Sequence, residues 1–98
     1  MENKTFLIVL GTPQNKEALL NYQEASASIM KHFGAKLPPN KLNINTRLVG
    51  SSRPKFMMKV EFPSPQHIKD AFNHPDYLAI VKDRDEGLSD LHIFIANE

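Results

Sequence analysis

Apolar and polar residues alternate along residues 55–62, and a repeat of two residues is typical of a β-strand with two different faces. One face carries only large apolar side chains: Phe56, Met58, Val60 and Phe62. The opposite face includes Lys59 and Glu61, which are two residues apart and therefore point to the same side. The pattern predicts a strand whose apolar face packs under helices and whose other face bears two charges.

Three further segments have strand patterns. Residues 5–10 and 91–96 are almost wholly apolar without alternation, which predicts strands covered on both faces. Residues 41–49 alternate loosely, which predicts a half-exposed strand. The turn residues at 50–54 join that strand to residues 55–62, so the two form a hairpin.

Helical spacing of apolar residues appears between the strands. The first stripe consists of Leu19, Tyr22, Ser26, Ile29, Met30 and Phe33. Thr12-Pro13 predicts its start as an N-cap followed by proline, and Gly34 predicts its end. Ser64-Pro65 repeats the starting device before a second helix. His74-Pro75 interrupts that helix, and a further helical piece ends at Gly87.

The predicted order of elements is β-α-β-β-α-β, in one domain that covers residues 1–98. This order predicts the α+β class and the ferredoxin-like fold, a four-stranded antiparallel sheet with the helices on one face. The other face is left open, although the first and last strands are apolar on both faces. A second copy is the simplest cover, so the sequence predicts a homodimer with the two sheets face to face.

Composition narrows the function classes. The formal net charge is +1, which gives no electrostatic footprint for nucleic acid or for an anionic membrane. The absence of cysteine excludes disulfides, thiolate nucleophiles and cysteine-ligated metals. The first apolar run is too short for the core of a signal peptide or for a bilayer span, so we expect a cytoplasmic protein.

Several short motifs occur together in this chain. They are His32-Phe33-Gly34, Gly50, Arg53-Pro54-Lys55, Val60-Glu61-Phe62-Pro63-Ser64, Ala71-Phe72, His74-Pro75-Asp76-Tyr77 and Arg84. With them the chain resembles a widespread bacterial family of domains of unknown function, within the dimeric α/β-barrel superfamily. The resemblance implies the ferredoxin-like fold and a dimeric α/β barrel, and Tyr22 falls near a tyrosine that this family tends to carry.

The chain departs from the family pattern at three places. Ser52 stands where the family often has tryptophan, and Pro38-Pro39-Asn40 replaces a pair of glycines. Lys59 stands where the family often has an apolar residue. These departures affect the expectation of a ligand shared with the family more than the expectation of the same fold.

Lys59 and Glu61 are the first candidates for a functional site. If their face is covered, these charges must pair with other groups or contact a polar ligand. A structural ion pair is the simpler interpretation, a polar ligand pocket is the main alternative, and exposure of both charges to solvent is the third. The pocket interpretation makes both residues candidate ligand-binding residues.

Four more side chains are candidate ligand-binding residues. Arg53 and Arg84, together with Lys55, carry the positive positions that the resemblance implies, and a guanidinium can clamp a carboxylate or phosphate. Tyr22 and Tyr77 lie at apolar helical positions, where a buried hydroxyl needs a partner. The histidines lack the spacing of metal ligands, so we expect no metal and no cofactor.

Two functions remain open on these grounds. The first is a small homodimeric protein that binds a small polar or anionic organic molecule between the sheet and the helices. The alternative is a cofactor-independent enzyme, monooxygenase-like or isomerase-like, with Glu61 or His92 as its single general base and Lys59 or Arg84 holding the developing anion. An RNA-binding module of the same topology is disfavoured, because the expected base-stacking positions are Met57 and Lys59.

Overall fold

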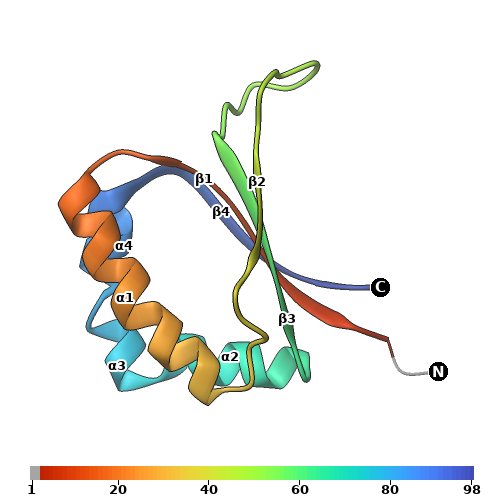
Figure 1. Ribbon diagram of the computed structural model, residues 1–98, viewed down its shortest axis with the longest axis vertical. Coiled ribbons are helices and arrows are strands. Elements are labelled where there is room, and N and C mark those ends of the chain that lie inside the picture. Colours follow the sequence, from red (N-terminus) through yellow and green to blue (C-terminus); the bar gives the residue numbers. More distant parts are fainter. Residues whose placement is uncertain (1–2) are drawn as a thin grey trace.

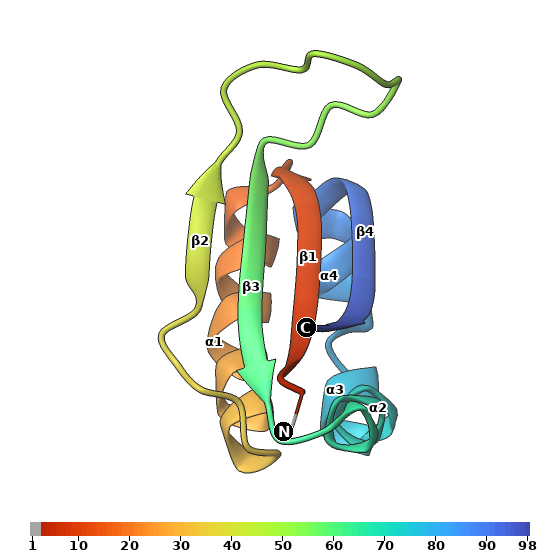
Figure 2. The same cartoon turned by 90° about the vertical axis from the view of Figure 1, so that its right-hand side faces the viewer.

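The protein is described by a computed structural model that covers residues 3–98. Its elements are β1 (Thr5–Pro13), α1 (Lys16–His32), β2 (Asn40–Asn43), β3 (Phe56–Phe62), α2 (Pro65–Asn73), α3 (Pro75–Leu78), α4 (Val81–Gly87) and β4 (Leu88–Asn97). The strands form a four-stranded antiparallel sheet in the order β2-β3-β1-β4. The helices lie against one face of this sheet, and the other face is left open (Figures 1 and 2). This arrangement confirms the predicted α+β, ferredoxin-like fold.

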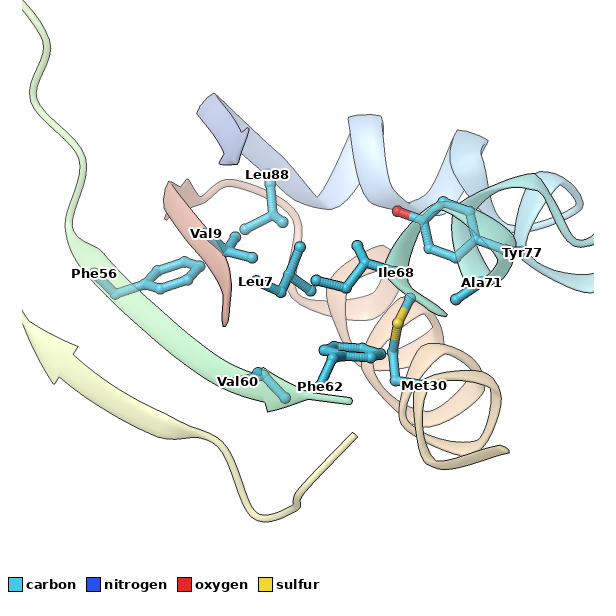
Figure 3. Packing of buried hydrophobic residues seen from close by; sticks show 10 residues of the cluster. All are labelled: Leu7, Val9, Met30, Phe56, Val60, Phe62, Ile68, Ala71, Tyr77 and Leu88. Atoms are coloured by element: carbon cyan, nitrogen blue, oxygen red, sulfur yellow. The ribbon is translucent and has the colours of Figure 1, made fainter. Parts of the chain in front are cut away.

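The pairing of the central strands decides which residues face the helices. β1 and β3 pair from Thr5 opposite Phe62 to Gly11 opposite Phe56, with Leu7 opposite Val60. The core cluster combines helix-facing side chains of β1, β3 and β4 with residues from α1, α2 and α3: Leu7, Val9, Met30, Phe56, Val60, Phe62, Ile68, Ala71, Tyr77 and Leu88 (Figure 3). The predicted apolar face of residues 55–62 is therefore the face that packs under the helices.

The start of α1 differs from the sequence prediction. β1 continues through Thr12 and Pro13, because these residues pair with β4 opposite Ser89 and Leu88. The N-cap of α1 is Asn15, whose side-chain oxygen accepts a hydrogen bond of 3.0 Å from the amide of Ala18. The prediction of a cap at Thr12-Pro13 is wrong, since pairing in the sheet takes precedence over the local capping signal.

The other predicted helix boundaries are present. Ser64 caps α2 by accepting from the amide of His67, with Pro65 as the first helical residue. His74 ends α2 and caps α3, where its Nδ1 atom accepts from the amide of Asp76. The proline interruption therefore separates α2 from α3, and a second break at Ala79-Ile80, which contains no proline, separates α3 from α4.

Gly34 ends α1 in a left-handed conformation with φ of 94°. Its amide donates to the carbonyl of Lys31, and the amide of Ala35 donates to the carbonyl of Met30. These two bonds form a Schellman motif, which satisfies the last carbonyls of the helix. A Cβ atom at Gly34 would lie 2.6 Å from Cγ of Pro63, so glycine is required there for space as well as for conformation.

β2 is much shorter than predicted. Only Asn40–Asn43 pair with β3, and residues 44–55 form a long connection that we call the arm. The arm projects beyond the end of the sheet, and its tip leans toward the side away from the helices (Figures 1 and 2).

The open face of the sheet combines apolar and charged side chains. β4 contributes Phe94, which is 53% exposed, and His92 stacks parallel to it with ring centroids 6.3 Å apart. Phe6 lies on the same face but is buried, because the ammonium of Lys59 lies 4.0 Å from its ring centroid and the lysine stem covers it. This face is the one for which the sequence predicts a cover.

Candidate functional site

A cavity of about 450 Å³ lies between the helix-facing side of the sheet and α1. The segment that leads from α1 to β2 completes its wall with Leu37, Pro38 and Pro39. The rest of the lining is mostly apolar and comes from every layer around it: Leu7, Val9, Leu19, Tyr22, Gln23, Ser26, Ala27, Met30, Lys41, Phe56, Met58, Val60, Phe72, Leu88, Leu91 and Ile93. A cavity of this size and character suits a small organic molecule.

Small side chains in the middle of α1 leave this space open. Ser26 and Ala27 line the cavity where a larger helical residue would fill it. Only Ala18 and Met30 of this helix are fully buried. The buried residues of the helix therefore lie near its two ends, and its middle stands over the cavity.

Tyr22, in the cavity wall, is the first member of a series of side-chain hydrogen bonds. The hydroxyl oxygens of Tyr22 and Tyr77 are 2.9 Å apart, although they come from α1 and α3. Nη1 of Arg84, on α4, donates to the hydroxyl of Tyr77 over 3.2 Å. Nε of Arg84 also donates to Oδ1 of Asp85 over 3.0 Å. Three helical segments thus bring together a carboxylate, a guanidinium and two phenols.

The chain of hydrogen bonds has a preferred direction. A guanidinium can only donate, so the hydroxyl oxygen of Tyr77 is the acceptor from Arg84. Tyr77 is only 1% exposed, so its hydroxyl proton needs an acceptor within the protein. Among the described residues, the hydroxyl oxygen of Tyr22 lies within hydrogen-bond distance of it. Since buried hydroxyl groups are normally paired, Tyr77 donates to Tyr22. The proton of Tyr22 is then available to a further acceptor.

The ionisation of this cluster follows from its burial. Burial raises the pKa of Tyr22 far above its ordinary value, and the neighbouring Tyr77 raises it further. Burial alone would lower the pKa of Arg84, but hydrogen bonds to Asp85 and Tyr77 hold it above its ordinary value. At neutral pH Tyr22 is therefore a neutral hydrogen-bond donor and Arg84 is a cation. Neither group is suited to act as a general base.

Of the candidate ligand-binding residues, the structure brings together Tyr22, Tyr77 and Arg84 and separates the others from them. Lys59 and Glu61 lie on the open face of the sheet, opposite the cavity. Glu61 pairs with Lys36, whose ammonium is 2.8 Å from Oε2, rather than with Lys59. The hydrogen bond from Lys36 lowers the pKa of Glu61 below its ordinary value, so this carboxylate is ionised and pairs near the surface.

The two remaining candidates also lie away from the cavity. His92 is on the open face, where Nε2 is 3.4 Å from Oδ1 of Asp90. Arg53 is in the arm, and its backbone amide donates to Oδ2 of Asp90 over 2.7 Å. Within residues 3–98, no three His, Asp or Glu side chains gather as a metal site would require.

The sequence predictions missed most of the cavity lining. Pro38-Pro39-Asn40 stands out in the sequence only as a departure from the family pattern, although Leu37, Pro38 and Pro39 complete the cavity wall. A signal was present in α1, where the run Ala25-Ser26-Ala27-Ser28 places only small residues in the middle of the amphipathic stripe. A stripe with such a gap indicates a helix that does not close onto its sheet.

No helix among the described residues combines the length and the apolar character needed to cross a membrane. A comparison with curated proteins finds no match. The chain does match solved structures of similar fold at low sequence identity. The chain matches a protein of unknown function from Rhodopseudomonas palustris with a TM-score of 0.78 and 18% identity, over 98% of this chain and 82% of that one.

Two other solved structures are informative. A dimeric ferredoxin-like protein of unknown function from Thermobifida fusca matches with a TM-score of 0.61 and 12% identity, over 100% of this chain and 93% of that one. SnoaB, a cofactor-independent oxygenase from Streptomyces nogalater, matches with a TM-score of 0.66 and 7% identity, over 98% of this chain and 92% of that one. These likenesses show the ferredoxin-like fold.

The sequence itself matches a family description over nearly all of its length. The match runs from residue 4 to residue 97 and therefore includes every strand and helix described above, the cavity and the arm. The chain belongs to the DUF1330 family, a domain of unknown function.

Proposed function

We propose that this protein is a homodimer that binds a small, largely apolar organic molecule with one hydrogen-bond-accepting oxygen. The observation that carries the proposal is the cavity of about 450 Å³ whose wall includes Tyr22. Apolar lining supplies affinity by removing ligand surface from water, and a few placed polar groups supply orientation. The mostly apolar lining supports a ligand whose polarity is concentrated at one acceptor, in place of the polar or anionic molecule expected from the sequence.

Tyr22 supports the choice of an acceptor oxygen. Its hydroxyl already accepts from Tyr77, and its proton remains to be donated. Arg84 donates to Tyr77 at the opposite end of this series of hydrogen bonds, so its positive charge polarises both phenols toward the ligand. A carbonyl oxygen, and still more an enolate or phenolate oxygen, is the partner that such a donor favours.

The open sheet face supports the homodimer. Phe94 and Leu42 are each 53% exposed there, beside half-buried Ile8 and Leu10. An apolar sheet face of this kind is normally covered. Several solved structures with this fold are described as dimeric. In such a dimer Lys59, Glu61 and His92 lie between the two sheets, and their role there is a structural or ligand-binding one.

A cofactor-independent oxygenase is the second candidate function. It is favoured by the fold shared with SnoaB and by the donor at Tyr22, which would hold an oxyanion as it develops on the substrate. The cavity lining among the described residues includes neither a carboxylate nor an imidazole. The substrate would therefore have to supply its own acidic proton, rather than lose it to Glu61 or His92.

A pair of matched probes tests the binding proposal by isothermal titration calorimetry. 2-Acetylnaphthalene and 2-ethylnaphthalene have similar size, but only the first has a carbonyl oxygen. We expect the ketone to bind the wild-type protein about three- to tenfold more tightly, the range of one hydrogen bond. Tyr22→Phe should abolish this difference while leaving the binding of the hydrocarbon unchanged.

Substitutions in α1 provide the control. Ser26→Leu fills the cavity and should abolish binding of both probes, whereas Ser28→Leu adds the same side chain at an exposed position outside the lining and should change neither. Native mass spectrometry of the purified protein reports the dimer and any small molecule retained in it. Equal binding by the wild-type and Ser26→Leu proteins would refute the cavity as the binding site.

A further inference from the structure

The arm, residues 44–55, exposes its apolar tip almost completely. Leu48 is 91% exposed and Val49 is 93% exposed, the highest values among the large apolar side chains of the described residues. Two adjacent aliphatic side chains at the end of a projection gain nothing within this chain, and their exposure to water is unfavourable. A tip of this kind indicates a contact with another molecule.

The arm is held in place at its base. The amide of Lys55 donates to the carbonyl of Gly11, and the amide of Ile44 donates to the carbonyl of Lys55, each over 2.8 Å. The hydroxyl of Thr12 donates to the carbonyl of Arg53, whose own amide is bound by Asp90. These bonds tie the base of the arm to β1 and β4, so the arm leaves the sheet from an anchored base.

That direction points toward the place a partner subunit would occupy. The tip leans away from the helices, on the same side as the open face of the sheet (Figure 1), and it extends beyond the end of the sheet above β1 and β4 (Figure 2). A second copy seated on the open face therefore lies within reach of the arm.

The charge distribution is complementary between two copies. Residues 25–60, which contain the arm, hold seven of the twelve basic residues and none of the eleven acidic ones. The remainder of the chain holds the other five basic residues and all eleven acidic ones. The basic segment of one copy therefore suits the acidic remainder of another, which favours a second copy over a partner of arbitrary charge.

We propose that the arm clasps the second copy of the chain, with Leu48 and Val49 packed against the partner subunit. The proposal rests on the homodimer proposed above and adds its interlocking element. Because the two copies are related by a twofold axis, each would contribute one arm and receive one. The clasp then explains why an apolar tip is carried on a basic projection whose base is anchored to the sheet.

Sedimentation equilibrium over a range of protein concentrations tests this proposal. Leu48→Ser combined with Val49→Ser should raise the dimer dissociation constant at least tenfold, because two arms lose their apolar contacts in each dimer. Leu20→Ser removes a leucine that is also exposed but lies on α1, in the helical layer, and should leave the constant unchanged. Circular dichroism should show the same fold in all three proteins.

Thiol labelling gives a second readout, since the chain has no cysteine of its own. Leu48→Cys should react with a thiol reagent at least tenfold more slowly above the dissociation constant than far below it. Leu20→Cys should react at the same rate at both concentrations. Equal rates for Leu48→Cys at both concentrations would overturn the proposal.

The outcomes separate the arm from the dimer. A wild-type protein that is monomeric at every concentration overturns both the homodimer and the clasp. A wild-type dimer that the double serine variant forms equally well overturns the clasp alone. If that variant dimerises normally but loses binding to vesicles of phosphatidylcholine and phosphatidylserine that the wild type retains, the tip contacts a lipid surface and the clasp is likewise overturned.

Discussion

The two tyrosines are the residues on which the candidate site depends. Tyr77 is nearly inaccessible and its hydroxyl is bound on both sides, by Arg84 and by Tyr22. Tyr22 is less enclosed and belongs to both the cavity wall and the hydrogen-bond chain. Removing either hydroxyl should therefore have different consequences for stability and for binding.

Tyr77→Phe should lower the free energy of unfolding by about 2 kcal/mol, because it leaves an N–H of the half-buried Arg84 guanidinium and the oxygen of Tyr22 without a partner. Tyr22→Phe breaks a single bond and should cost about 1 kcal/mol. Urea unfolding followed by circular dichroism measures both. If the double variant lost as much unfolding free energy as the two single variants together, the two hydroxyls would not be energetically coupled.

The raised pKa of Tyr22 makes the protein less stable in alkali. In the unfolded chain this phenol ionises near its ordinary value of about 10, while in the folded protein it keeps its proton to higher pH. The folded state then binds more protons than the unfolded state, so stability falls as pH rises above about 10. Below that pH this contribution is fully present.

Above this pH, the free energy of unfolding should fall by up to about 1.4 kcal/mol per pH unit because of this one group. Urea unfolding at several pH values should show that Tyr22→Phe has a shallower loss than the wild type above pH ~10. Comparison of the two proteins removes the shared titration of the lysines. Parallel curves would show that the phenol of Tyr22 ionises as readily in the folded protein as in the unfolded chain.

At the scale of elements, the caps decide where helices begin. Asn15 satisfies the amide of Ala18, whereas Thr12 bonds to the arm through the carbonyl of Arg53. Asn15→Ala should therefore cost about 1 kcal/mol of unfolding free energy, the usual value of an N-cap. Thr12→Ala should cost less than about 0.5 kcal/mol, as for an exposed hydrogen bond. Thermal or urea unfolding that ranks them in the opposite order would refute Asn15 as the cap.

The end of α1 provides a matched test of packing. Gly34 and Gly50 both have positive φ, but a Cβ atom at Gly34 would meet Pro63 at 2.6 Å, while nothing lies within 4 Å of one at Gly50. Gly50→Ala should cost about 1 kcal/mol for conformation alone. Gly34→Ala should cost about 2–3 kcal/mol, since overlap with Pro63 is added. Equal losses in urea unfolding would show that Pro63 moves aside freely.

At the scale of the whole molecule, the sheet has one covered face and one open face. Covering the open face with a second copy would bury Phe94 and His92 together with the half-buried apolar residues of β1. Phe94→Lys should raise the dimer dissociation constant by at least about tenfold, because a buried charge without a partner costs several kcal/mol. Sedimentation equilibrium measures this constant.

Leu78→Lys is the control for that experiment, since Leu78 is similarly exposed but belongs to α3 in the helical layer. It should leave the association unchanged. Equal weakening by both substitutions would place the interface on the helices instead of the sheet.

The alternation in residues 55–62 was enough to predict the faces of the central strand, because side-chain direction in a strand is fixed by the backbone. Ser64-Pro65 and His74-Pro75 likewise predicted the second helical region, since caps and prolines act within a few residues of themselves. These local rules fixed the order of elements, and the order fixed the ferredoxin-like fold.

The site was only partly predictable. Tyr22, Tyr77 and Arg84 were candidates, but their meeting depends on how α1, α3 and α4 pack, and Tyr22 and Tyr77 are 55 residues apart in the chain. The pairing of Glu61 with Lys36 depends in the same way on where the segment after α1 returns to the sheet. Hydrogen-bond partners that are distant in sequence have no local signature.

The sequence by itself determined the strands, the helices and their order, because each is encoded in a short window of apolar spacing and capping residues. The tertiary structure alone decided where α1 stands away from the sheet, which side chains line the resulting cavity, and which way the arm leans. It also moved the start of α1 from Thr12 to Asn15, since the pairing of β1 with β4 competes with the local cap. The physical reason is that a cavity, a partner and a direction in space are properties of packed surfaces, which only the folded chain brings together.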